Sequence, residues 1–348
     1  MGTRAHPVIL VGEEIPLKVQ VRRFIRLAAY TQLLPVLESG EETTLIGGQA
    51  VMEGVMMRSP QSYCVAVRKP NGEIITESKP LPKVADRYPI FKLPFLRGIG
   101  TLGQAMKLGV QALQFSANAA LADEEKAKDS KAEAKPLSGL AMTLNLAFSL
   151  IFFFFLYKFV PLWLTTQMQK SVPQLSNQIL FNLVDGLIRI AIFLVFLYGI
   201  SRWRDIHRVF EFHGAEHRVV FNFESGKEVN IPNAQSFVTF HPRCGTSFLI
   251  VVMLISMCIY SLLPFTDFAS KMISRFLLLL PIAGLSYEII RFAAKRPGSL
   301  LGIITAPGLW LQRITTQTPA DDQTEVAIAA LQGAMELERQ QGGPLVIA

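Results

Sequence analysis

The chain has 348 residues, of which 50% are hydrophobic and only 18% are charged. These fractions and a mean hydropathy of +0.34 favour a membrane protein. The net charge of +7 and the isoelectric point near 9.3 would suit a nucleic-acid-binding protein, but the basic residues flank apolar segments and form no single patch interleaved with aromatic residues. We therefore attribute the charge to an attraction to anionic lipid headgroups and expect no nucleic-acid partner.

The N-terminal part of the chain is predicted to lie outside the membrane. Residues 1–43 form an N-terminal extension with no visible cleavable signal sequence. Residues 44–94 contain short β-like runs, and the pair Asn71-Gly72 between residues 63–68 and 73–77 predicts a hairpin. We expect residues 44–94 to form a small β-rich cytoplasmic domain.

Two polar segments lead to the first long apolar run. Between residues 95 and 121, apolar side chains recur at helical spacing, which predicts an amphipathic helix (95–121) lying in the membrane interface. Residues 122–137 are rich in alanine, lysine and acidic residues and have no apolar stripe. They are expected to form a charged, solvated linker.

Four segments are apolar enough, and long enough at about 20 residues each, to cross a bilayer. They are residues 138–164, 178–200, 246–263 and 271–294. Residues 138–296 are therefore predicted to be a four-helix membrane domain. Lysine and arginine collect before the first span, between the second and third, and after the fourth, so both termini and a histidine-rich loop (201–245) are predicted to be cytoplasmic.

The C-terminal residues 297–348 are predicted to be a cytoplasmic tail. Residues 321–340 within this tail have small and apolar residues on one face, which indicates a soluble helix. The predicted fold is thus a mainly α membrane protein with four transmembrane helices, a small cytoplasmic β-rich N-terminal domain and an interfacial amphipathic helix.

His213, Glu216 and His217 form the pattern His-x-x-Glu-His, the inverted form of a zinc-protease signature. On a helix, His213 and His217 lie one turn apart on the same face, so both can bind a single metal ion. Glu216 is then the candidate catalytic base. The alternative is that both histidines are interfacial residues that pair with neighbouring glutamates.

His241 and Cys244 follow in the same predicted loop, and both are good ligands for zinc or another borderline divalent metal. If both join His213 and His217, the site is closed and structural, whereas three protein ligands leave a position open for catalysis. Cys244 also precedes a predicted spanning helix, whose dipole favours a thiolate. It has two further interpretations: a nucleophile with His241 as its base, or a small buried cysteine.

Ionisable residues fall within two of the predicted spans. Glu288, near the cytoplasmic end of the fourth span, is a candidate catalytic base or further metal ligand, and the alternative is an ion pair with Arg291 one turn away. Asp185 and Arg189 share a face of the second span. We expect them to form a structural pair between helices, with a polar path through the bundle as the alternative.

Three further polar residues alternate with glycines and methionines in residues 47–60. They are Gln49, Glu53 and Arg58. Such a stretch suits a tight backbone path with a few directed polar groups, so these residues are possible site residues. An ordinary loop entering a strand has the same composition.

Five segments of the chain together closely resemble the bacterial YqhQ-like family. They are GQAVMEGVMMR (48–58), FHGAEH (212–217), HPRCGT (241–246), YE (287–288) and PGLWLQ (307–312). The resemblance runs in the same order from about residue 45 to about residue 331 and excludes the N-terminal stretch and the charged linker. It implies a multi-pass membrane protein of a family described only as predicted metal-dependent enzymes, and it leaves the reaction open.

The sequence supports two hypotheses of function. The first is a membrane-embedded metal-dependent enzyme of the hydrolase class in the bacterial plasma membrane, with a divalent metal, zinc in the first place, at the cytoplasmic face. His213 and His217 with His241 or Cys244 are its ligands, and the substrate is a lipid headgroup or a membrane-proximal peptide. The second is a non-enzymatic assembly or transport factor whose metal is structural. The sequence leaves the oligomeric state open.

Overall fold

A four-stranded antiparallel sheet opens the part of the chain that the computed structural model describes, residues 46–82, 84–128, 139–241, 244–295 and 300–341. Its strands are neighbours in chain order: β1 (Gly47–Val51), β2 (Gly54–Arg58), β3 (Ser62–Arg68) and β4 (Ile74–Pro80). The predicted hairpin is confirmed, because Arg68 of β3 pairs with Ile74 of β4. Gly72 turns between them with a φ of 88°, a conformation that glycine adopts without strain.

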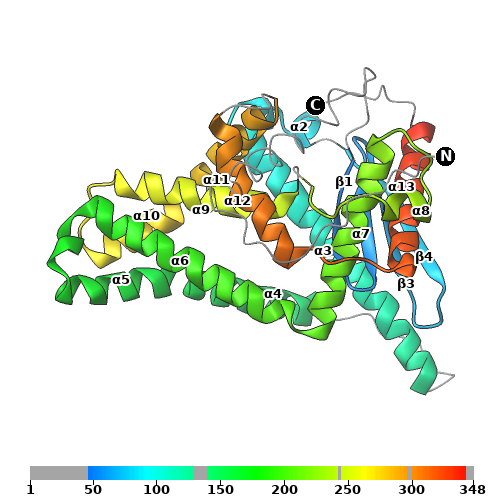
Figure 1. The fold of residues 1–348 in the computed structure, drawn as a ribbon, viewed down its shortest axis with the longest axis horizontal. Coiled ribbons are helices and arrows are strands. Elements are labelled where there is room, and N and C mark those ends of the chain that lie inside the picture. The colour runs from blue at the N-terminus through cyan, green and yellow to red at the C-terminus, as the bar shows by residue number, and fades with distance from the viewer. Residues whose placement is uncertain (1–45, 83, 129–138, 242–243, 296–299, 342–348) are drawn as a thin grey trace, which may run out of the picture.

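Helices cover both faces of this sheet. Successive side chains of a strand point to opposite faces, so Val55 and Met57 face α7 (Arg204–Glu224) and α13 (Asp321–Gln340), while Met56 faces α3 (Leu96–Lys128). Two short helices, α2 (Val84–Arg87) and η1 (Pro89–Lys92), link β4 to α3. The body of the protein, formed by this sheet with α3, α7 and α13, is therefore built from segments that precede the apolar helices, lie between them and follow them (Figure 1).

The helix α3 is longer than predicted and has a role that its amphipathic pattern did not reveal. It continues to Lys128, into the predicted linker, and residues 129–138 lie outside the described residues. Leu108 and Ala112 are buried against the sheet, which explains the apolar stripe without a bilayer. Met106 and Leu113 stay exposed, so the predicted contact of 95–121 with the membrane interface remains a prediction.

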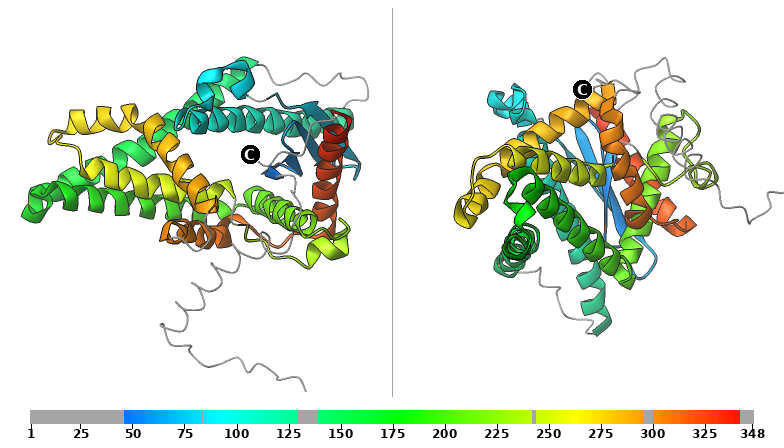
Figure 2. Two further views of the ribbon diagram at one scale, coloured as in Figure 1. Left: turned by 90° about the horizontal axis from the view of Figure 1, so that it is seen from above. Right: turned by 60° about the vertical axis from the view of Figure 1, so that its left-hand side comes forward.

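An arm of apolar helices, which comprises residues 139–201 and 245–295, extends from the body (Figures 1 and 2). Its first part consists of α4 (Gly139–Phe154), the π-helical turn η2 (Phe155–Phe159), α5 (Val160–Ser171), the short η3 (Pro173–Ser176) and α6 (Gln178–Ser201). Two helical stretches are long and apolar enough to cross a membrane, Ala147–Ser171 with 25 residues and Gln178–Ser201 with 24. The second matches the predicted span, and the first lies further along the chain than predicted because the helix continues through the π-turn to Ser171.

The predicted number of four transmembrane helices is not confirmed. The third is the apolar but short α9 (Gly245–Ser261), and the fourth is divided into α10 (Phe268–Leu277) and α11 (Leu279–Lys295), which are bent by 52°. By length and composition the described residues hold two candidate spans, or three if the bent pair counts as one. Pro281 has no N–H to donate to the carbonyl of Leu277, so the sequence tolerates a break at this point.

The predicted histidine-rich loop is largely helical, since α7 and the short α8 (Ile231–Gln235) occupy much of it. The tail contains α12 (Leu300–Thr315) and α13, whose bounds match the predicted soluble helix. The buried face of α13 is lined by Val326, Ala330 and Ala334, which pack in one core with α7 and the sheet. The N-terminal extension, 1–43, lies outside the described residues.

Candidate metal centre

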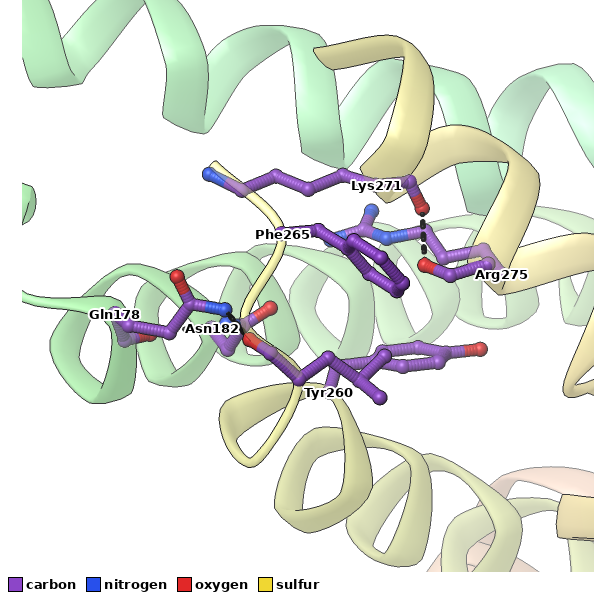
Figure 3. A pocket seen from close by; sticks show the side chains of 8 residues that line it. Gln178, Asn182, Tyr260, Phe265, Lys271 and Arg275 are labelled. Atoms are coloured by element: carbon purple, nitrogen blue, oxygen red, sulfur yellow. Dashed lines mark hydrogen bonds between the residues drawn. The ribbon is translucent and has the colours of Figure 1, made fainter. Parts of the chain in front are cut away.

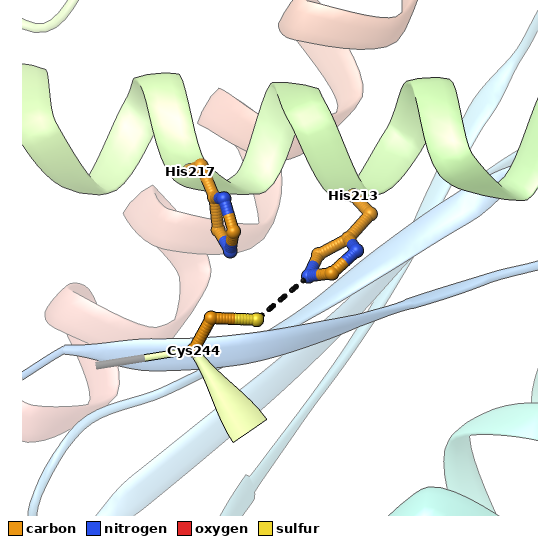
Figure 4. Close-up of side chains that lie close together, drawn as sticks. All are labelled: His213, His217 and Cys244. Carbon is orange, nitrogen blue, oxygen red and sulfur yellow. Dashed lines mark hydrogen bonds between the residues drawn. The ribbon is translucent and has the colours of Figure 1, made fainter. Parts of the chain in front are cut away.

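Three of the four predicted metal ligands meet between α7 and the start of α9. His213 and His217 lie one turn apart on α7, and their rings point toward Cys244, the residue that precedes α9 (Figure 4). The ligand atoms of the three residues all lie within 4.8 Å of one another. His213 and Cys244 are half-buried and His217 is buried, so the cluster is partly exposed to solvent. This arrangement can hold a single metal ion.

Backbone carbonyls orient both imidazole rings. Nδ1 of His213 lies 2.7 Å from the carbonyl oxygen of Thr315, and Nδ1 of His217 contacts the carbonyl oxygen of Thr239. In each pair Nδ1–H donates, because a carbonyl only accepts, and the Nε2 lone pair is left for another partner. Nε2 of His213 is 3.2 Å from Sγ of Cys244. Histidines that bind metals are oriented in this way by a hydrogen bond from the other ring nitrogen.

The protonation states of the cluster also suit a cation. Burial lowers the pKa of His217 to about 4, so its ring is neutral at pH 7 and keeps the lone pair that a metal requires. Burial alone would raise the pKa of the Cys244 thiol, but the neighbouring His217 and Thr246 outweigh it, and the pKa lies below its usual value. A lowered thiol pKa favours the thiolate, the form that binds metals.

Glu216 lies beside this cluster and faces the first strand. Its side chain is 6% exposed, and burial raises the pKa of its carboxyl to about 8, with Cys244 adding to the rise. The backbone N–H of Gly48 donates to the carboxyl group, while Oε2 has no hydrogen-bond partner among the described residues. A Cβ at Gly48 would lie 3.1 Å from the Glu216 carboxyl carbon and 2.4 Å from the carbonyl oxygen of Met56. Gly48 therefore allows the close approach of β1 to α7.

His241 is buried next to the cluster but does not belong to it. Its ring centroid is 5.5 Å from that of His217, and its Nε2 lies 3.6 Å from Oε2 of Glu224. Gln312 of α12 holds the backbone on both sides, since the His241 N–H donates to Oε1 at 2.7 Å and Nε2 donates to the His241 carbonyl at 2.8 Å. The structure thus places His241 as a neighbour of the three-residue cluster.

Glu288 lies away from the histidines. It accepts from Nε of Arg97 at 2.7 Å, contacts the Nη2 of the same residue, and accepts from the N–H of Phe95 at 3.2 Å. The predicted roles as ligand or base are therefore not supported by its position, and its direct ion-pair partner is Arg97 on α3, in place of the predicted Arg291. The pair connects the start of α3 to α11.

The polar residues of the first hairpin point in several directions. Gln49 packs against α3, where a Cβ at Gly109 would lie 3.0 Å from its Nε2. Glu53 lies in the turn of the hairpin with a φ of 52°. Its carboxylate forms a bidentate ion pair with Arg208 of α7, in which Nε donates to Oε1 and Nη2 donates to Oε2 at 2.7 Å. Arg58 is on the α3 face of β2, and burial lowers its pKa. None of the three joins the histidine cluster.

Several groups that shape the site were not singled out by sequence reasoning. The carbonyls of Thr239 and Thr315 carry no side-chain signal, because any residue can supply them. Gly214 lies within the histidine motif, and a Cβ there would lie 2.0 Å from the carbonyl oxygen of Gln317. Gln312, which binds the backbone of His241, ends the segment 307–312 of the family resemblance. Its place in that segment was the sequence signal that could have identified it.

The fold and the cluster define a class of protein: mainly helical, with a small antiparallel sheet, helices apolar enough to cross a bilayer, and a histidine–cysteine cluster where they join the body. The profile of the family described as "Protein of unknown function (DUF1385)" matches residues 93–337, and the chain belongs to this family. It is 33% identical over 299 residues to "Uncharacterized protein YqhQ" of Bacillus subtilis (strain 168), covering 84% of this chain and 92% of that protein. The predicted family is confirmed. No solved structure matches the chain.

Proposed function

We propose that the protein is a membrane-embedded metal-dependent enzyme of the hydrolase class, whose divalent metal, most simply zinc, is held by His213, His217 and Cys244. The observation that carries the proposal is the convergence of three ligand atoms within 4.8 Å, with both imidazoles oriented by backbone carbonyls. Two imidazoles and a thiolate are a ligand set that zinc accepts. Three protein ligands leave a coordination position open, as catalytic zinc sites do.

The residues around the cluster support a hydrolytic role. A divalent metal in this place would supply Lewis acidity toward a carbonyl or phosphoryl oxygen. Glu216 holds a proton at neutral pH because its carboxyl is buried, and its Oε2 has no hydrogen-bond partner among the described residues. A nearby cation would lower the pKa of this carboxyl, so Glu216 can accept and return a proton beside the open position. The backbone N–H of Gly48 donates to the Glu216 carboxyl group and keeps it in one orientation.

The core of the body limits how the arm can cross a bilayer. Phe212 and Val219 of α7 share a buried cluster with Val326 and Ala330 of α13, so these helices lie on the same side of any membrane. The chain between them must therefore cross an even number of times. Either both α9 and the bent pair α10–α11 cross the membrane, or neither does. A total of three spans would place α7 and α13 on opposite sides of the membrane.

Four crossings are supported by a contact at the free end of the arm. Nε2 of Gln178, the first residue of α6, donates to the carbonyl of Leu263, just beyond α9. The end of α9 therefore reaches the level at which α6 begins. If α6 spans the membrane, α9 reaches the same far face and the bent pair returns. This proposal keeps the body, with both termini, on the cytoplasmic side of the plasma membrane.

The substrate we propose is a lipid headgroup or a membrane-proximal peptide bond. The cluster is formed by α7 of the body and by the residue that begins α9, a helix of the arm. A site at this junction would lie near the bilayer surface if the arm is embedded. The same position favours a second function, in which the metal fastens α7 to α9 in an assembly or transport factor without catalysis.

Metal analysis of the purified, unchelated full-length protein tests the site. About one equivalent of zinc per chain is expected in the wild type, and His217→Ala should lose it because two ligands bind zinc far more weakly than three. His207→Ala serves as the matched control, since His207 is a half-exposed histidine on the same helix outside the cluster. His241→Gln should retain the metal. Absence of stoichiometric metal from the wild type would contradict both functions.

Glu216→Gln separates the enzyme from the structural alternative. An enzyme predicts that this variant keeps the metal and loses hydrolysis of the natural lipid or peptide substrates by at least about a hundredfold, the usual effect of removing a general base. A structural metal predicts unchanged function in Glu216→Gln and a lower thermal midpoint in His217→Ala. Equal activity of Glu216→Gln and wild type would refute the catalytic role of this residue.

A further inference from the structure

The helical arm buries more positive than negative charge near its free end. In the described part of the arm, the buried charged side chains are one carboxylate, Asp185, and four bases, Lys158, Arg189, Lys271 and Arg275. They come from η2, α6 and α10, and they lie far along the chain from the histidine cluster. Ionisable groups within an apolar helical bundle are costly, so such a group marks a functional position.

The single carboxylate is shared between two guanidinium groups. Asp185 and Arg189 form the predicted pair at 2.5 Å, and the other Asp185 oxygen lies 2.9 Å from Nη1 of Arg275. Arginine keeps its charge in proteins, so one carboxylate cannot neutralise both groups. At least one positive charge therefore remains in the bundle even when both lysines are neutral.

Aromatic rings around these buried basic side chains stabilise part of their positive charge. Nζ of Lys271 is 3.6 Å from the ring centroid of Phe181, and the guanidinium carbons of Arg189 and Arg275 lie 5.5 and 5.4 Å from the centroid of Tyr260. Ring faces attract cations but carry no net charge. Asp267 at the N-cap of α10 also acts on Lys271, but it is exposed to solvent and lies outside the buried group, so a counter-ion is still required for the buried charges to be neutral.

A small cavity adjoins the excess charge. Arg275 is 1% exposed, and its Nη2 has no hydrogen-bond partner among the described residues. Arg275 and Lys271 line the cavity together with Asn182, Tyr260 and other residues of α6 and α9–α10 (Figure 3). Its volume of about 10 Å³ is the space open to the centre of a small particle, so the cavity has room for a single water molecule or ion. Water would satisfy the N–H donor but would leave the charge unmatched.

We propose that this cavity binds a small monovalent anion, such as chloride, between Arg275 and Lys271. The anion accepts from the free Nη2 donor and balances the guanidinium that Asp185 leaves unpaired. The cavity is too small to enclose a whole phosphate group, so an anionic lipid competes by inserting one phosphate oxygen. The site lies near the contact between Gln178 and Leu263, at the end of the arm opposite the body.

Thermal unfolding of the full-length protein in zwitterionic phosphatidylcholine nanodiscs tests the site. Sodium chloride replaces sodium gluconate at constant ionic strength, and we expect the unfolding midpoint to rise with chloride and then saturate. Lys271→Gln should weaken the apparent chloride affinity about tenfold, the effect expected when one charged contact is lost. Lys170→Gln is the matched control, because Lys170 is an exposed lysine of the arm, bonded to Gln167 and away from the cavity.

Arg275→Gln provides the second test. Asp185 keeps its pair with Arg189 in this variant, so the carboxylate is not left alone. We expect the chloride response to disappear and the midpoint in chloride-free buffer to be equal to or above that of the wild type. A wild type without a saturable chloride response in phosphatidylcholine, or an Arg275→Gln variant with an unchanged response, would overturn the proposal.

Nanodiscs that contain phosphatidylglycerol distinguish the source of the anion. If the headgroup phosphate occupies the site in the membrane, the wild-type response to chloride decreases in these discs and Arg275→Gln shows no such difference between lipids. If free chloride is the occupant, the wild-type response is the same in both lipids. Either result supports an anion site at Arg275. Broadening of the chloride-35 resonance by the wild type, and its loss in Arg275→Gln, gives a direct measure of binding.

Discussion

At the scale of single residues, Glu216 shows how burial prepares a carboxyl group for proton transfer. Its folded pKa of about 8 lies above the usual value of 4.5, because the group is removed from water. A carboxyl group whose pKa is raised in the folded protein makes its full contribution to stability at a pH below its usual pKa. That contribution is lost as the pH rises from the usual pKa to the pKa in the folded protein. The metal-free protein is therefore expected to lose stability on account of Glu216 between pH 4.5 and 8.

Between pH 6.5 and 8, the effect of Glu216 on stability can be measured apart from that of the buried histidines. The pKa values of His217 and His241 are lowered to about 4 from 6.5 by burial, so these rings affect stability only below pH 6.5. In chelator-treated protein, we expect the difference in unfolding free energy between Glu216→Gln and wild type to grow from pH 6.5 to 8 by roughly 1.4 kcal/mol per pH unit. Denaturant unfolding at fixed ionic strength measures it. A difference independent of pH would show that Glu216 is ionised in the folded protein.

Sequence reasoning predicted the composition of the candidate site in part. Helical spacing placed His213 and His217 on one face, and the structure brings Cys244 to them as one of the two predicted further ligands. His241 could not be distinguished from Cys244, because a backbone clamp by Gln312 from a distant helix decides where its ring lies. The position of Glu288 was not predictable either, since its partner Arg97 is on α3 and no local pattern connects them.

At the scale of secondary-structure elements, the close packing of α7 against the segment before α13 positions the cluster. Gly214 is one residue from His213, and the carbonyl of Gln317 occupies the space where a Cβ would lie, at 2.0 Å. Thr315, whose carbonyl orients His213, belongs to the same stretch. A side chain at Gly214 would push this stretch and α7 apart and would disturb the site as well as the fold.

Gly214→Ala is therefore expected to lower the unfolding free energy by about 1 to 3 kcal/mol, the usual cost of overpacking. Gly103→Ala on α3 is the matched control, since Gly103 is also helical and has no atom within 4 Å of an added Cβ. This change should stabilise the protein by up to about 1 kcal/mol, through helix propensity alone. Thermal or denaturant unfolding measures both. Equal effects of the two substitutions would show that the contact at Gly214 yields without cost.

Elements with a strong local signal were predicted well. The Asn71-Gly72 hairpin, the second apolar helix and the terminal helix 321–340 have turn residues or periodic patterns of their own. The break between α10 and α11 was missed because hydropathy averages over the buried polar residues Lys271, Ser274 and Arg275, which make α10 amphipathic. The sheet contacts of α3 were missed because an apolar stripe does not specify whether lipid or protein covers it.

At the scale of the whole molecule, the body is assembled from three parts of the chain that the arm separates. The sheet precedes the arm, α7 lies between its two halves, and α13 follows it, and all three share one buried core. Each excursion of the arm must therefore leave the body and return to it. If the apolar helices cross a membrane as proposed, the shared core therefore permits two or four crossings and excludes three.

Labelling of single introduced cysteines with a membrane-impermeant maleimide tests this restriction in intact cells and inverted vesicles. Cys258 is changed to Ala, and the label on the half-buried Cys244 is subtracted by measuring the same protein without an introduced cysteine. Lys227→Cys after α7 and Arg339→Cys near the end of α13 are exposed positions of the body and must react from the same side. Lys170→Cys, at the exposed end of the first candidate span, should react from the opposite side. Thr266→Cys, in the connection between α9 and α10, should behave like Lys170→Cys if the contact of Gln178 with Leu263 lies at the far face.

Reaction of Thr266→Cys from the side of the body would reduce the crossings to two. Reaction of Lys227→Cys and Arg339→Cys from opposite sides would require the shared core of α7 and α13 to be absent in the membrane.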